Sequence, residues 1–179
     1  MIAPGRAACL LLLVLSWGCS STAHRPAGPL DFPWGASRKD LVAQYGDRIR
    51  PSPRQAPEDT NDQFEITDYE FEGLLFVATF KVNRKTDALG EVVLILSSSE
   101  EAQASLLSGF NRLDSAFTKL LGAADARYIS NTNKPAIVTR GVIWSKASPW
   151  VLLRYEYVQG LINALIIHVQ ESSRRTLLG

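Results

Sequence analysis

One histidine and a few acidic residues are the side chains best suited to acid–base chemistry. His168 is the only histidine after residue 24, and Asp68 and Glu70 share a face of a predicted strand with Ile66. A catalytic histidine needs a nucleophile and an orienting group, but the sequence has no Gly-x-Ser-x-Gly motif. The acidic pair is typical of a solvated edge strand, and two histidines with two cysteines are too few for a Cys/His zinc site. We therefore predict a non-enzymatic protein with no catalytic, metal-binding or cofactor-binding residues.

Composition and charge set the broader limits. The chain has 179 residues, which is the length of one domain. Its hydrophobic fraction of 46% and charged fraction of 21% are those of a globular protein rather than a disordered one. A formal net charge of +1 excludes a chain-wide electrostatic attraction to nucleic acid, so we predict no nucleic-acid partner.

The start of the chain has the pattern of an export signal. Arg6 precedes the charge-free and mostly apolar segment 7–18, which is too short for a membrane-spanning helix of roughly 20 residues. Gly18-Cys19 follows directly, and this junction resembles the lipobox of bacterial lipoproteins. The resemblance implies that a signal peptide, residues 1–18, is removed and that Cys19 carries acyl chains such as palmitate. The membrane is then a partner through this lipid.

Residues 19–29 are polar and contain Pro and Gly, so we expect a lipid-anchored flexible tether that reaches roughly 30 Å when extended. Ser20 stands where, in the resembling family, an aspartate tends to hold lipoproteins at the inner membrane. That comparison implies an outer-membrane anchor with the protein facing the periplasm. The alternative is ordinary cleavage after the small residues 21–23, which would give a secreted or soluble periplasmic protein. With Cys19 acylated, the mature chain has no second cysteine for an intramolecular disulfide.

Residues 30–172 are predicted to form one domain in which the order helix, loop and three strands occurs twice. A C-terminal tail follows at 173–179. Ser37 and Asp40 form a capping-box pattern and Gly46 a stop signal. The second helix is marked by an apolar stripe of Leu106, Phe110, Leu113, Phe117, Leu120 and Leu121. We predict an α+β fold of two tandem units, 30–96 and 97–172, each with one helix and a three-stranded antiparallel sheet, the helices packing on one sheet face. The predicted segments are helices at 37–45 and 97–121, loops at 47–63 and 123–136, and strands at 64–71, 75–82, 89–96, 137–145, 151–158 and 161–170.

Alternation along the strands assigns the two faces of the sheet. Val151, Leu153, Tyr155 and Tyr157 should pack under the helices, because the alternate face carries charges that would be costly there. The open face then combines charged and apolar side chains, which is typical of a contact surface. Trp150 follows a Ser-Pro turn, and we expect it to be exposed. The candidate partner-binding residues are Thr79, Lys81, Leu152, Arg154, Glu156 and Trp150.

The run Phe32-Pro33-Trp34-Gly35-Ala36-Ser37, followed by Leu41 and Tyr45-Gly46, resembles the opening of uncharacterised bacterial envelope lipoproteins. The order of elements is similar to that of beta-lactamase inhibitor protein and of the small outer-membrane assembly lipoproteins. This resemblance implies a binding or scaffold role with an envelope protein as partner. Two alternatives stay open: a periplasmic carrier of a small apolar or amphipathic ligand held between helices and sheet, and an envelope hydrolase, which would require Asp68, Glu70 and His168 to converge.

Overall fold

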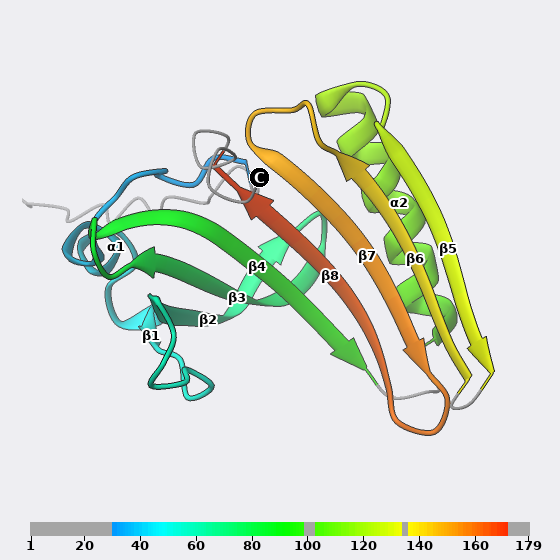
Figure 1. Cartoon of the computed structure of the whole chain (residues 1–179), viewed down its shortest axis with the longest axis horizontal. Coiled ribbons are helices and arrows are strands. Elements are labelled where there is room, and N and C mark those ends of the chain that lie inside the picture. The colour runs from blue at the N-terminus through cyan, green and yellow to red at the C-terminus, as the bar shows by residue number, and fades with distance from the viewer. Residues whose placement is uncertain (1–29, 99–102, 134–135, 172–179) are drawn as a thin grey trace, which may run out of the picture.

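The described part of the protein is one twisted antiparallel sheet with helices on one side. The computed structural model describes residues 30–98, 103–133 and 136–171, and within them eight strands pair in the order β1-β2-β3-β4-β8-β7-β6-β5 (Figure 1). Two α-helices and a 3-10 turn, Gly46–Arg48, complete these described elements. The helices are α1 (Arg38–Tyr45) and α2 (Gln103–Leu121), and the strands are β1 (Arg50–Pro51), β2 (Asn61–Phe71), β3 (Leu74–Asn83), β4 (Ala88–Ser98), β5 (Ala126–Asn133), β6 (Ala136–Trp144), β7 (Trp150–Val158) and β8 (Ile162–Gln170).

The prediction of an α+β fold built from two helix-plus-three-strand units is therefore wrong. The described chain is dominated by β structure, and β4 pairs directly with β8, so that both halves belong to one continuous sheet. Each helix precedes four strands, because β1 lies inside the predicted loop 47–63 and β5 inside the predicted loop 123–136. Ser97 and Ser98, expected to start the second helix, end β4 instead. Glu100 and Glu101, which fall within the predicted second helix, lie outside the described residues.

The predicted cap of the first helix is confirmed. The backbone N–H of Asp40 donates to the Ser37 hydroxyl at 3.2 Å, and the backbone N–H of Ser37 donates to the Asp40 carboxylate at 3.0 Å. Within α1 only Leu41 is fully buried, so this eight-residue helix depends on its cap and on the core contacts of Leu41 and Tyr45. Gly46 ends it with a φ of 56°, which a residue with a side chain adopts only at a cost.

Both helices lie on the same face of the sheet. Strand register places Phe80, Val92, Val169, Val151 and Trp144 in one row across five strands. Tyr45 of α1 contacts Phe80 at one end of this row, and Phe117 of α2 contacts Trp144 at the other, with ring centroids 5.2 and 5.5 Å apart. The row therefore forms the floor of a single hydrophobic core under both helices.

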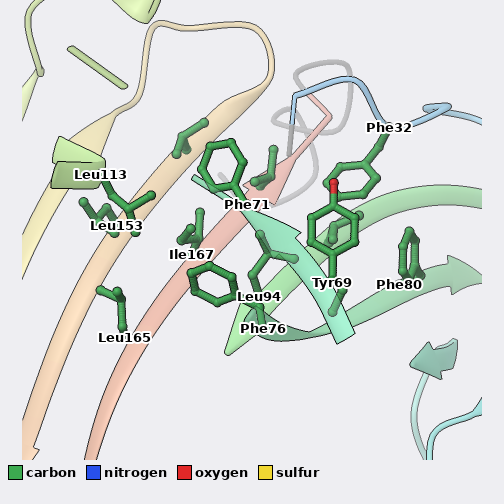
Figure 2. Close-up of a cluster of buried hydrophobic side chains, with 14 of the residues drawn as sticks. Phe32, Tyr69, Phe71, Phe76, Phe80, Leu94, Leu113, Leu153, Leu165 and Ile167 are labelled. Carbon is green, nitrogen blue, oxygen red and sulfur yellow. The ribbon is translucent and has the colours of Figure 1, made fainter. Parts of the chain in front are cut away.

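The end of the β2–β3 hairpin folds over this core. A register shift between Ile66 and Tyr69 bends β2, which brings Phe71 to 5.6 Å from the Phe117 ring of α2. Figure 2 shows Phe71 and Tyr69 lying over Leu94, Phe76 and Ile167 of the sheet. The hairpin thus ties the first half of the sheet to the helix that covers the second half.

Among the described residues, no helix is both long enough and apolar enough to cross a membrane.

Candidate interaction surface

The face of the sheet opposite the helices carries most of the predicted partner-binding residues. Val151, Leu153 and Tyr155 are buried on the helix side, as alternation predicts, so their neighbours Leu152, Arg154 and Glu156 point to the other side. Strand register extends this open face to β3, because Thr79 pairs with Val93. One row across the open face consists of Glu65, Thr79, Val93, His168 and Leu152.

The open face is hollowed. A depression of about 290 Å³ crosses β2, β3, β4, β8 and β7, and three predicted residues, Thr79, Lys81 and Arg154, line it. Its apolar floor is largely protected from solvent, since Val93 is 5% exposed and Ile166 is 8% exposed. The full lining is Arg54, Gln63, Glu65, Thr79, Lys81, Val93, Ile95, Arg154, Ile166 and His168.

A carboxylate that sequence reasoning missed lies between Lys81 and His168 beside this depression. Glu91 lies 2.9 Å from the Lys81 ammonium and 3.5 Å from Nδ1 of His168, measured to the same carboxylate oxygen, Oε1. Burial alone would raise the pKa of Glu91, but hydrogen bonds from His168 and Lys81 outweigh it and hold that pKa below its ordinary value. Glu91 was detectable in principle, because it stands two residues before Val93 on the same strand face.

The other charged side chains of the open face differ in which residues they contact. Arg154 Nε lies 3.1 Å from the Glu156 carboxylate two residues along β7, and the Ser52 hydroxyl donates to Glu65 at 2.6 Å. Arg54 reaches the depression from the segment before β2 and makes no ion pair with another described residue. Because the segment around Arg54 has no alternating or helical pattern, the sequence offered no reason to place this residue on the open face.

The other predicted residues lie near the depression or beyond the described chain. Leu152 is half-buried and pairs with His168, next to the lining. Trp150 is also half-buried, at the start of β7 in register with Gln170, so the expectation that it is exposed is wrong. Cys19, the predicted lipidation site, lies outside the described residues.

The described residues do not assemble the acid–base group that an envelope hydrolase would require. Asp68 is exposed at the bend of β2 and lies 3.2 Å from Arg48, in a different depression from the one that His168 lines. Glu70 is exposed nearby on the same strand. Within residues 30–98, 103–133 and 136–171, no group of three or more His, Cys, Asp or Glu side chains is placed to bind a metal ion.

Comparison with known proteins gives no relative: no protein-family model, curated protein or solved structure matches this chain.

Proposed function

We propose that this protein is a non-enzymatic binding module of the bacterial cell envelope that holds a protein partner against the open face of its sheet. The observation that carries this proposal is the depression across five strands, with an apolar floor and charged walls. A surface of this kind resembles the centre and rim of protein interfaces, where apolar contacts are enclosed by polar groups that fix orientation. Nine of the ten lining residues lie on strands of the sheet, and Arg54 lies in the segment before β2.

The charges of the surface support a protein partner. Lys81 and His168 both contact the carboxylate of Glu91, so these three side chains are held in place before a partner arrives. Side chains that are already ordered lose less conformational entropy on binding. A partner that offers a carboxylate to Arg54 would add a charge-assisted contact at the rim.

The envelope location rests on the leader and on Cys19. Acyl chains on this residue would hold the protein at the outer membrane, facing the periplasm, and the tether 19–29 would let the sheet meet a partner near the membrane. The carrier alternative has no observation in its favour among the described residues. Phe117 of α2 packs against the rings of Phe71 and Trp144, between the helix and the sheet, where a small ligand would have to lie.

The experiment is site-specific photo-cross-linking of the full chain in bacterial envelopes. A photoreactive residue at Glu156 should give a discrete adduct, and the double substitution Leu152→Asp with Arg154→Asp should abolish it. The matched control is Lys119→Asp with Leu120→Asp, which makes the same change of charge on the exposed side of α2 and should leave the adduct intact. Equal adduct yields from all three proteins would show that the open face is not the interface.

A further inference from the structure

The outer strand β5 has an open edge. It pairs with β6 along its whole length, from Ala126 opposite Ile143 to Asn133 opposite Ala136, without a register shift, and it is the last strand of the sheet (Figure 1). Backbone groups on its outer side therefore have no neighbouring strand among the described residues. All side chains from Ala126 to Thr132 are exposed, and Ile129 is 66% exposed.

This edge lacks the usual protection against strand pairing. Natural edge strands are short, bulged, or carry Pro or Lys, and the opposite edge of this sheet follows that rule. There, β1 has two residues, one of them Pro51, and further prolines follow at 53 and 57. β5 has eight residues, no Pro and no Lys, and its single charge, Arg127, is paired with Asp114 of α2 at 2.8 Å.

We propose that β5 binds β5 of a second copy of this chain, antiparallel, around a two-fold axis at Ile129. The two eight-stranded sheets would then continue into one another. In this register Ile129 faces its own copy, Tyr128 faces Ser130, and Arg127 faces Asn131. Residues that face each other across an antiparallel pair share a sheet face, and this arrangement satisfies that condition at every position.

The sequence of β5 is complementary to itself in this register. No like charges meet, because Arg127 stands opposite an uncharged amide and its own charge already serves Asp114. The most exposed large apolar side chain of the strand, Ile129, is covered by its copy. The Tyr128 ring lies on the opposite face of the sheet from Ile129, over Gly141 of β6, so it does not obstruct the contact between the two Ile129 side chains. An isologous contact of this kind closes as a dimer and leaves the open face of each copy on the same side of the joined sheet.

Disulfide trapping in the full chain, produced in bacterial envelopes, tests the proposal. Facing residues of antiparallel strands have Cα atoms about 4.5–5.5 Å apart, inside the range of about 4.4–6.8 Å that a disulfide spans. The substitution Ile129→Cys should therefore give a disulfide-linked dimer on oxidation. Leu161→Cys is the matched control, because Leu161 is 78% exposed but lies in the turn between β7 and β8, and it should stay monomeric.

Charge exchange identifies the partner as a second copy. Ile129→Lys and Ile129→Glu should each weaken dimerisation at least about tenfold in sedimentation, because like charges then face each other. Mixing the two variants should restore the dimer, while Leu161→Lys should dimerise like the unmodified chain. The proposal is overturned if the unmodified chain sediments as a monomer, if Ile129→Cys forms no dimer, or if Ile129→Cys is cross-linked to another protein instead.

Discussion

Gly141 provides the sharpest test of the packing on the open face. It lies in the middle of β6, opposite Tyr128 of β5 on one side and Arg154 of β7 on the other. A Cβ atom at this position would stand 2.1 Å from Cε1 and Cζ of the Tyr128 ring, so the ring occupies the place of the missing side chain. The substitution Gly141→Ala must therefore push the ring outward, toward solvent.

The size of the effect follows from the area of the Tyr128 ring that becomes exposed to solvent. Tyr128 is 37% exposed, so most of its surface is covered in the native state. If the ring gives up roughly 60–80 Å² of covered surface, the free energy of unfolding falls by about 1.5–2 kcal/mol. Alanine is better than glycine inside a strand by about 0.5–1 kcal/mol, which leaves a net loss of about 1 kcal/mol.

The sign of the effect should reverse when the ring is absent. In a Tyr128→Ala background, Gly141→Ala has nothing to displace and should stabilise the protein by about 0.5–1 kcal/mol. Urea unfolding of the four proteins gives the two effects and their coupling, which we expect at about 1.5–2 kcal/mol. If Gly141→Ala has the same effect in both backgrounds, the ring does not lie over this glycine and the reasoning is wrong.

Three further outcomes follow from the sequence and the structure. If Cys19 carries the proposed acyl chains, Cys19→Ala should release the protein from membranes into the soluble fraction on cell fractionation. A hydrogen bond from Arg84 holds the pKa of Asp62 below its ordinary 3.8, so this carboxylate stabilises the fold above that pH and loses its contribution as the pH falls through its lowered pKa. Urea midpoints of Asp62→Asn and the unmodified protein should therefore differ at neutral pH and converge in strong acid. Ser37→Ala removes the acceptor for the Asp40 N–H, and urea unfolding should show a loss of about 1 kcal/mol.

Local signals in the sequence were enough to predict the buried strands and the first helix. In β7, Val151 and Leu153 are fully buried and Arg154 faces the open side, as the alternating pattern predicts. The Ser37 cap was equally readable, because a capping box involves residues only three positions apart. An alternating strand and a helix cap can be predicted because the residues that determine each of them lie within a few positions of one another.

The two strands that the sequence did not reveal, β1 and β5, are the edge strands of the sheet. β5 has one neighbour, and its residues from Ala126 to Thr132 are exposed, so it needs no alternating apolar pattern and read as a polar loop. Its structure is decided by pairing with β6, the next strand along the chain, rather than by an apolar pattern of its own. The join of β4 to β8 is non-local, and it turned two predicted units into one sheet. Pairing over such distances leaves no mark in a single stretch of sequence.

The open face shows the same difference between what local patterns predict and what depends on strand pairing. Thr79, Lys81 and Arg154 were predicted from alternation and do line one depression. Which charges meet there was beyond prediction, since Glu91 contacts Lys81 across β3 and β4 and His168 across β4 and β8.

If the open face is the binding surface proposed above, Glu91 explains how that face can hold a charge beneath a partner. A carboxylate beneath a bound partner would lose its water, and that loss is costly when the charge is unpaired. Here Lys81 and His168 already supply its partners, and their contacts lower its pKa despite its burial. The desolvation cost is thus largely met during folding, so a partner that covers Val93 and Ile166 can gain the full benefit of apolar contact.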